Sequence, residues 1–378
     1  MKKPVKTILS WCLAAIIAAS CANLISFFYR SGAGSINREN AFSISIRTPN
    51  SRMVRGSEGY GINHVDANGY LNDDTLPLSE QYILLMGSSH AEGLQVMQKD
   101  SMTAVLNNLI DPNVRTVYNL GTAGYTLPLI IEGFQAALDE FPNSSAIMIE
   151  ISQLDFSNDE LTQAMNQATF DPASTGQALM DSLGTGRRVR NDLLSAIPLI
   201  SLLRQQIESM NFSMRDAFGI RDYFNKLATS ATTQNNADAD LEDIAPQGEE
   251  IAAQSAATGG SNGNFEALNQ ALALLRSEYD KPIILLYHAG VSILPDGTIS
   301  INRDMQYYDD YRAACEANDI VFVDTADAFL AAYQADFSLP YGFFNTTMQG
   351  GHLNALGHKI VALEFYKAWM NMQEEEKN

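Results

Sequence analysis

The sequence predicts an α/β fold: a doubly wound parallel sheet in a three-layer, flavodoxin-like arrangement, interrupted by an insertion and preceded by a membrane helix. Two observations lead to this prediction. Short apolar runs alternate with longer amphipathic segments over residues 81–155 and again over 264–372, as in parallel sheets covered by helices on both faces. The chain has 378 residues, of which 46% are hydrophobic, and this is enough for one large core.

The first half of the predicted core, residues 81–155, contains three short apolar runs that are typical of buried parallel strands. Two segments with helical spacing separate these runs. The expected elements are strands at 82–86, 114–119 and 146–151 and helices at 101–110 and 127–141.

The second half of the predicted core, residues 264–372, repeats this alternation and is followed by an acidic tail at 373–378. Short apolar runs again lie between longer segments with helical periodicity. The expected elements are helices at 265–279, 305–317 and 355–370 and strands at 282–287 and 320–324.

Three regions precede or interrupt this core. Residues 31–80 are polar and rich in turn residues, and Asn68-Gly69 predicts a β-hairpin within this lead-in. Residues 156–230 have helical character and form an insertion after the third core strand. Residues 231–263 lack apolar periodicity and aromatic side chains, so we expect a disordered linker there.

Residues 1–30 are predicted to contain a transmembrane helix. The stretch from Ile8 to Phe28 has 21 residues without a charge and follows several lysines, so it is long enough to span a bilayer with a cytoplasmic N-terminus. A cleaved lipoprotein signal with Cys21 at its cleavage site is the alternative. In either case we expect a protein of the cell membrane, single-pass if the helix is kept, with its folded domain outside the cytoplasm.

The charge and the cysteines exclude several classes of function. The net charge is −20 at pH 7, although the first thirty residues carry only basic charges. A surface this acidic has no electrostatic footprint for nucleic acid, and it favours membrane contact through the N-terminal helix alone. Cys315 is the one cysteine outside the apolar segment, and no Cys/His spacing is typical of a metal site. We therefore expect no disulfide, metal or cofactor.

Two polar motifs, one in each half of the core, contain the side chains of a candidate catalytic site. Gly87-Ser88-Ser89-His90 follows the first apolar strand, so Ser89 would lie where the chain turns into a helix and directs backbone N–H groups at an anion. His352 follows Gly351 before the closing helix. A serine hydroxyl becomes nucleophilic when a neutral imidazole accepts its proton, which makes Ser89 and His352 the candidate pair. Ser89 could instead be a turn residue, and His352 a helix-capping one.

These motifs resemble the sequence blocks of the SGNH (GDSL-like) hydrolase superfamily. Gly87-Ser88-Ser89 is similar to the first block, which implies Ser89 as the nucleophile and puts Ser88 at the usual Asp position. The segment from Asn119 to Gly124 resembles the second block, which implies that the N–H groups of Gly124 and Ser89 bind the oxyanion. The segment from His352 to His358 resembles the last block and implies His352 as the general base.

Two positions depart from the superfamily's pattern. Gln349 stands where the resemblance places the triad aspartate, and Leu154 stands where it places an oxyanion-binding asparagine. Gln349, a backbone carbonyl or a carboxylate from elsewhere would have to orient the base, because an imidazole without such a partner loses orders of magnitude in rate. The further candidates for the pocket are Ser88, His90, Ser152, Gln153, His288 and Asn354, whereas His358 is expected to be structural.

The resemblance implies an extracytoplasmic serine esterase that removes O-acyl groups from an acylated glycan of the cell surface or from another small ester. Two alternatives remain open. Anchored proteins of similar layout act in surface-polymer acylation, which would make this chain an O-acyltransferase beside a multi-span membrane acyltransferase. The two departures also allow a non-catalytic glycan-binding protein on the same fold.

Overall fold

The computed structural model contains two compact units. One unit contains the N-terminal helix, and the other contains the α/β core. The predicted insertion at 156–230 is described as far as Ala168 and at three further positions, and the predicted disordered linker at 231–263 lies outside the described residues. The described residues are 3–29, 35–37, 45–73, 80–110, 116–168, 197, 199–200, 264–347 and 350–375.

Helix α1 (Lys3–Tyr29) forms the described part of the first unit together with a short piece of the insertion. Its segment Thr7–Phe28 is 22 residues long and has the length and composition of a membrane span. Trp11 and Ile16 are largely exposed on it, with 73% and 63% of their surface accessible. A single-pass anchor fits this helix, and a signal sequence has the same properties.

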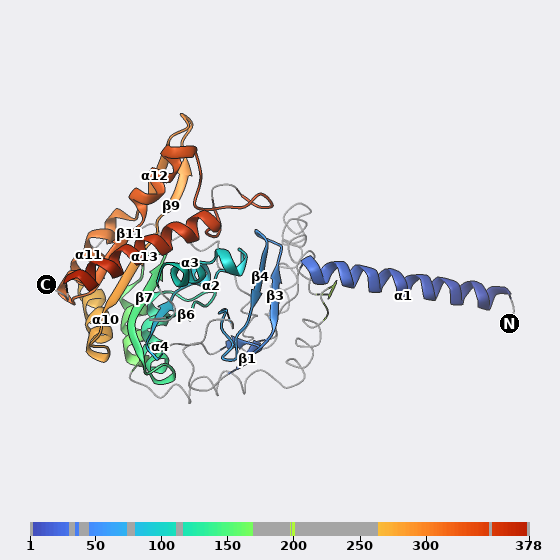
Figure 1. The fold of residues 1–378 in the computed structure, drawn as a ribbon, viewed down its shortest axis with the longest axis horizontal. Helices are drawn as coiled ribbons and strands as arrows, with labels where there is room; N and C mark the ends of the chain where they lie inside the picture. The colour runs from blue at the N-terminus through green and yellow to red at the C-terminus, as the bar shows by residue number, and fades with distance from the viewer. Residues whose placement is uncertain are drawn as a thin grey trace, which may run out of the picture. The chain divides into compact units, whose positions relative to one another are not determined.

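The core contains a five-stranded sheet in the order β11-β8-β7-β5-β6, and every neighbouring pair is parallel. The predicted doubly wound parallel sheet is therefore confirmed (Figure 1). The chain passes from β5 to β6 on one side and then to β7 on the other, so β5 and β7 flank the point where the winding reverses. The strands are β5 (Tyr82–Met86), β6 (Thr116–Asn119), β7 (Ser144–Ile151), β8 (Ile283–Tyr287) and β11 (Val321–Asp324).

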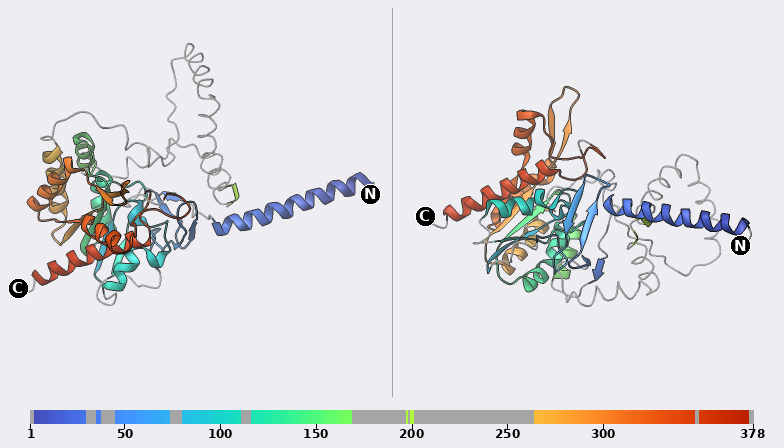
Figure 2. Two further views of the ribbon diagram at one scale, coloured as in Figure 1. Left: turned by 90° about the horizontal axis from the view of Figure 1, so that it is seen from above. Right: turned by 45° about the vertical axis from the view of Figure 1, so that its right-hand side comes forward.

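Helices cover both faces of this sheet, as Figures 1 and 2 show. Alternate residues of each strand point to opposite faces, so Leu84 and Met86 of β5 pack in one core cluster while Ile83 and Leu85 pack in the other. The first cluster is closed by α4 (Leu127–Glu140), α5 (Asn158–Ala168), α10 (Asn264–Glu278) and α11 (Met305–Ala317). The second is closed by α3 (Met102–Leu109), α12 (Ala326–Asp336) and α13 (Ala355–Glu375).

The lead-in contains two antiparallel ribbons, β1 (Ser35–Asn37) with β2 (Ser45–Arg47) and β3 (Arg52–Arg55) with β4 (Gly61–His64). The second ribbon is a hairpin that lies earlier in the chain than the sequence predicted. Asn68-Gly69 does form a tight turn, but no paired strands flank it. The Asp66 carboxylate accepts the N–H groups of Asn68 and Tyr70 instead, so a capped loop forms here.

The short helix α2 (Ser89–Glu92) begins at Ser89, where the sequence indicated that the chain turns into a helix. The turn η1 (Gln98–Asp100), helix α12 and the hairpin described next were not predicted from the sequence. A hairpin of β9 (Gly290–Ile293) and β10 (Ile299–Asn302) extends from the end of β8.

Substitution of Gly357 tests how closely α13 packs on the segment before it. A Cβ at this position would lie 2.2 Å from the Pro340 carbonyl oxygen and 2.7 Å from Leu353 Cδ2. Gly357→Ala should therefore destabilise the protein by about 1–3 kcal/mol, although alanine normally stabilises a helix interior by about 1 kcal/mol. Denaturant unfolding measures the change. The control is Gly290→Ala, whose Cβ would meet nothing closer than 3.7 Å, and equal stability of the two variants would contradict the packing.

Candidate active site

The turn between β5 and α2 presents Ser89 at the end of the sheet where the winding reverses. Ser88 is the N-cap of α2, and its Oγ accepts the His90 N–H at 3.2 Å. Gly87 must be glycine because a Cβ there would lie 2.5 Å from the Glu150 carboxylate and 2.8 Å from the Ala91 Cβ. Ser89 is then the first residue of the helix, partly exposed.

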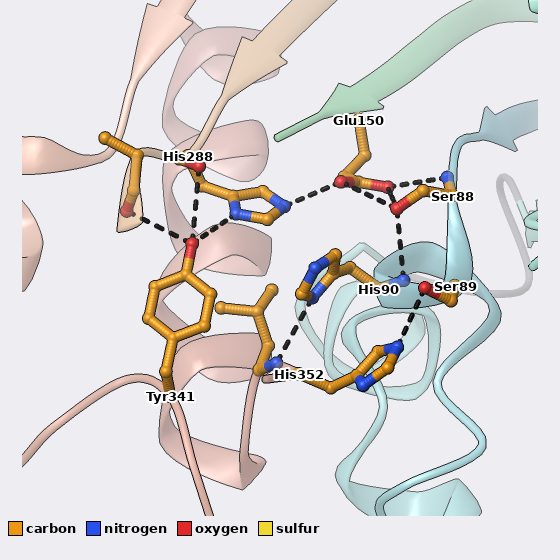
Figure 3. Close-up of polar contacts among 9 residues, drawn as sticks. Ser88, Ser89, His90, Glu150, His288, Tyr341 and His352 are labelled. Atoms are coloured by element: carbon orange, nitrogen blue, oxygen red, sulfur yellow. Dashed lines mark hydrogen bonds and ion pairs between the residues drawn. The ribbon is translucent and has the colours of Figure 1, made fainter. Parts of the chain in front are cut away.

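Ser89 and His352 meet in the folded chain although 263 residues separate them. The Ser89 Oγ lies 2.9 Å from His352 Nε2 (Figure 3), which is within hydrogen-bond reach for a nucleophile and its general base. A bridge between Tyr341 and Leu353 and a hydrogen bond from the Gly342 N–H to the His352 carbonyl fix the backbone around the imidazole.

Glu58 supplies the carboxylate that the last sequence block lacks. Its Oε2 lies 2.7 Å from His352 Nδ1, and its Oε1 accepts the His352 N–H at 2.9 Å. This contact holds the imidazole with Nε2 free to accept the serine proton. Burial opposes ionisation of Glu58, but its hydrogen bonds and charge interaction with His352 outweigh burial and lower its pKa.

Glu58 is held in place by a clasp between the β3–β4 loop and residues 341–347. Asn345 Oδ1 accepts the Gly59 N–H at 2.8 Å, and its Nδ2 donates to the carbonyls of Gly56 and Gly59 at 2.9 and 3.0 Å. On the other side, Gly351 has φ +77°, and a Cβ on it would lie 2.3 Å from Glu58 Oε1. The carboxylate approaches the backbone closely because residue 351 has no side chain.

The Ser89 N–H is the best-placed donor for an oxyanion. It is the first N–H of α2, and it donates to no acceptor among the described residues. Gly124 is exposed in the turn after β6 with φ +83°. Leu154 is buried in the core, Ser152 is partly buried and Gln153 is exposed, and none of the three contacts Ser89 or His352 through a described hydrogen bond.

His90 lies beside the pair as a neutral imidazole. Its Nδ1 accepts the Leu353 N–H at 3.2 Å, which places its proton on Nε2. Its ring centroid lies 5.0 Å from that of His352 and 4.7 Å from that of His288. Burial and then the charges of the neighbouring histidines lower its pKa well below the usual value, so it stays uncharged.

A second polar chain runs behind Ser89, through Ser88, Glu150, His288 and Tyr341 (Figure 3). Glu150 Oε2 accepts the Ser88 N–H at 2.8 Å, and its Oε1 lies 2.6 Å from His288 Nε2. His288 and Glu150 have no exposed side-chain surface. His288 therefore does not line the pocket as the sequence suggested, because it is enclosed behind the turn that carries Ser88.

Asn354, which the sequence made a pocket candidate, has a structural role. Asn354 caps α13: its Oδ1 accepts the N–H groups of Leu356 and Gly357, and its Nδ2 donates to the Leu339 carbonyl. Both polar atoms of its side chain are thus used in backbone hydrogen bonds around the start of α13, away from the pocket. Gln349 lies outside the described residues.

Two further titratable side chains, His358 and Cys315, are buried. His358 is buried, and its Nδ1 accepts the Met102 N–H at the start of α3 at 3.2 Å. Cys315 is buried in the core, and burial raises its pKa to about 12. No cluster of three or more His, Cys, Asp or Glu side chains suited to a metal occurs in the part of the chain that the structure describes.

Sequence reasoning did not identify Glu58, Glu150 or Tyr341 as site residues. Glu58 lies 294 positions before His352 in a polar lead-in, and acidic residues in such segments are usually solvated. Glu150 did stand out as the one charge in an apolar strand, and a buried charge implies a partner. That observation alone could have directed attention to it.

Comparisons with known proteins return similar solved structures. A catalytic mutant of an acetylxylan esterase from Geobacillus stearothermophilus matches with a TM-score of 0.36 and 12% identity over 77% of this chain and 95% of its own. The acetyl xylan esterase AlAXEase matches with a TM-score of 0.38 and 10% identity over 76% and 98%. A lipolytic G-D-S-L family protein from Veillonella parvula matches with a TM-score of 0.34 and 10% identity over 77% of this chain and 98% of its own. No family model and no curated protein sequence matches the chain.

The role of Glu58 is testable through the reactivity of Ser89. Glu58→Gln keeps the size of the side chain but removes the charge that stabilises a protonated His352, so the rate of fluorophosphonate labelling at Ser89 should fall by roughly 10²- to 10⁴-fold. Glu266→Gln, an exposed carboxylate on α10, is the control and should label at the unaltered rate. Equal labelling rates for the Glu58 variant and the unaltered chain would remove Glu58 from the site.

His358 predicts a pH dependence of stability. Burial lowers its pKa to about 3, whereas an unfolded histidine titrates near ~6.5. At this residue the unfolded chain binds a proton that the folded protein does not bind. The free energy of unfolding should therefore fall by about 1.4 kcal/mol per pH unit as the pH drops below ~6. His358→Gln should reduce this slope by the contribution of one proton, as measured by urea unfolding at pH 7, 6 and 5. Parallel curves for the two proteins would contradict a neutral buried His358.

Proposed function

We propose that this protein is a membrane-anchored, extracytoplasmic SGNH-type serine esterase that removes O-acyl groups, with Ser89 as nucleophile and His352 as base. The observation that carries the proposal is the continuous contact from Glu58 through His352 to Ser89, at 2.7 and 2.9 Å. The sequence resemblance led to the serine and the histidine, and the Glu58 carboxylate takes the role of the aspartate that Gln349 replaces. A complete triad also favours catalysis over a purely glycan-binding role.

In the first half-reaction, His352 Nε2 takes the proton of Ser89 Oγ as the oxygen attacks the ester carbonyl carbon. Glu58 stabilises the imidazolium that forms, because it lies against Nδ1. The N–H groups of Ser89 and Gly124 would bind the oxyanion, with the dipole of the short helix behind the former. Collapse of the intermediate expels the alcohol, which takes its proton from His352, and leaves an acyl-serine.

In the second half-reaction, water gives a proton to His352 and attacks the acyl carbonyl. The intermediate then releases the carboxylic acid and restores the Ser89 hydroxyl. The same acyl-serine could instead be attacked by a sugar hydroxyl, which is the transferase alternative. The two outcomes differ only in the acceptor.

The glycan substrate rests on the location of the domain and on the sequence resemblance. Helix α1 would hold the core at the outer face of the cell membrane, within reach of acylated surface glycans. The net charge of −20 also suits a neutral substrate better than a polyanionic one.

The proposal is tested with the full-length chain in detergent. The unaltered protein should be labelled by a fluorophosphonate and should hydrolyse p-nitrophenyl acetate, and Ser89→Ala should abolish both. Ser300→Ala, on β10 away from the site, should change neither. Labelling that survives Ser89→Ala, or no labelling at all, would rule out Ser89 as the nucleophile.

A second measurement separates hydrolysis from transfer. The protein is incubated with an O-acetylated oligosaccharide and a deacetylated acceptor of different mass. Acetate released without a mass gain on the acceptor supports the esterase, whereas acetyl transfer to the acceptor supports the O-acyltransferase.

A further inference from the structure

The second polar chain behind Ser89 has no part in the proton transfers of the triad, although it ends on the residue before the nucleophile. Its members come from four places in the sequence: Ser88 after β5, Glu150 on β7, His288 after β8, and Tyr341. Glu150 accepts both the N–H and the Oγ–H of Ser88, at 2.8 and 2.9 Å. It therefore fixes the turn from which the Ser89 N–H projects, one peptide unit away.

A carboxylate in this place should harm the reaction unless its charge is compensated. Charges that are enclosed by protein are screened weakly, and the oxyanion would form at the adjacent Ser89 N–H. An uncompensated Glu150 would repel that developing negative charge. Glu150 is nevertheless ionised: burial opposes its charge, but hydrogen bonds and charge interaction with His288, followed by those from Ser88, lower its pKa.

The contacts around Tyr341 have room for a doubly protonated His288. The Tyr341 hydroxyl lies 3.1 Å from the Ala289 carbonyl oxygen, 3.3 Å from that of His288 and 2.6 Å from His288 Nδ1. Carbonyl oxygens only accept, and when the single hydroxyl proton is directed to them the short contact is made by a proton on Nδ1. The 2.6 Å contact with ionised Glu150 is made by a proton on Nε2.

We propose that His288 is held as an imidazolium between Glu150 and Tyr341, so that Glu150 can anchor the nucleophile turn without opposing the oxyanion at Ser89. His288 and Glu150 are positioning residues, since neither touches the substrate. This role rests on the proposed esterase function. The other titratable groups that face the pair do not compete for its proton, because His90 and His358 stay neutral and Tyr341 stays protonated.

The charge of His288 can be read without any activity. Histidine-selective ¹⁵N NMR of the full-length protein at pH 7.5 should contain one imidazolium, with both ring nitrogens protonated, and His288→Gln should remove that signal. A neutral tautomer for His288 would overturn the proposal. This outcome is independent of the esterase proposal, which the Ser89→Ala comparison tests.

The catalytic consequence is tested by a double-mutant cycle with p-nitrophenyl acetate. His288→Gln leaves the Glu150 carboxylate unpaired, so kcat should fall by roughly tenfold to a hundredfold. KM should change little, because the repulsion acts on a charge present only in the transition state. Glu150→Gln combined with His288→Gln removes both charges and should recover most of the lost kcat.

A purely structural role for Glu150 and His288 predicts the opposite order of kcat for the single and double variants. Losses of packing and hydrogen bonds would accumulate, and the double variant would be the slowest. A double variant no faster than His288→Gln therefore overturns the electrostatic role. The matched control is Asp324→Asn, which breaks a partly buried ion pair with Arg303 at 2.6 Å at the edge strand of the same sheet. It should leave kcat unchanged when assayed below its melting temperature.

Discussion

The contact between Glu58 and His352 joins the lead-in hairpin to the α/β core, and the candidate site depends on it. An imidazole can rotate about its side-chain bonds, and it is useful as a base only while one nitrogen faces the serine. The carboxylate engages both Nδ1 and the backbone N–H of the same residue. Ring orientation and loop position are thereby set by one side chain.

The sheet topology explains why the other groups converge on the same point. Strands β5 and β7 are neighbours, and the winding of the chain reverses between them. No helix crosses directly over the end of the sheet at such a point, which leaves room for a ligand. The end of β5 supplies Ser88 and Ser89, and β7 supplies Glu150. The site therefore has a reactive layer facing outward and a charged, enclosed layer behind it.

The parts of this arrangement that depend on residues adjacent in the chain could be predicted from the sequence. The apolar runs predicted all five core strands to within two residues of their observed ends, because strands buried on both faces must be apolar throughout. Ser89 and His352 were identified from motifs that stay together in the chain. Glu58 and the role of Glu150 could not be predicted, since each depends on a partner at least 62 residues away. Asn354 was a pocket candidate through its motif and His288 through its place after a core strand, and neither property reveals which way a side chain points.

The position of Glu58 on the lead-in hairpin affects how the site is assembled. When the acid and the base lie three residues apart, one loop carries both and they move together. Here the acid is on a hairpin whose attachment to the base-bearing loop consists of the Glu58 contacts and the Asn345 clasp. Loss of the clasp would leave Ser89 and His352 in place but free the imidazole to rotate. Met53 of the hairpin packs in a small cluster with Val65, Leu71 and Leu94, apart from the two clusters that cover the sheet, so the hairpin contributes more to the orientation of the base than to the packing of the sheet.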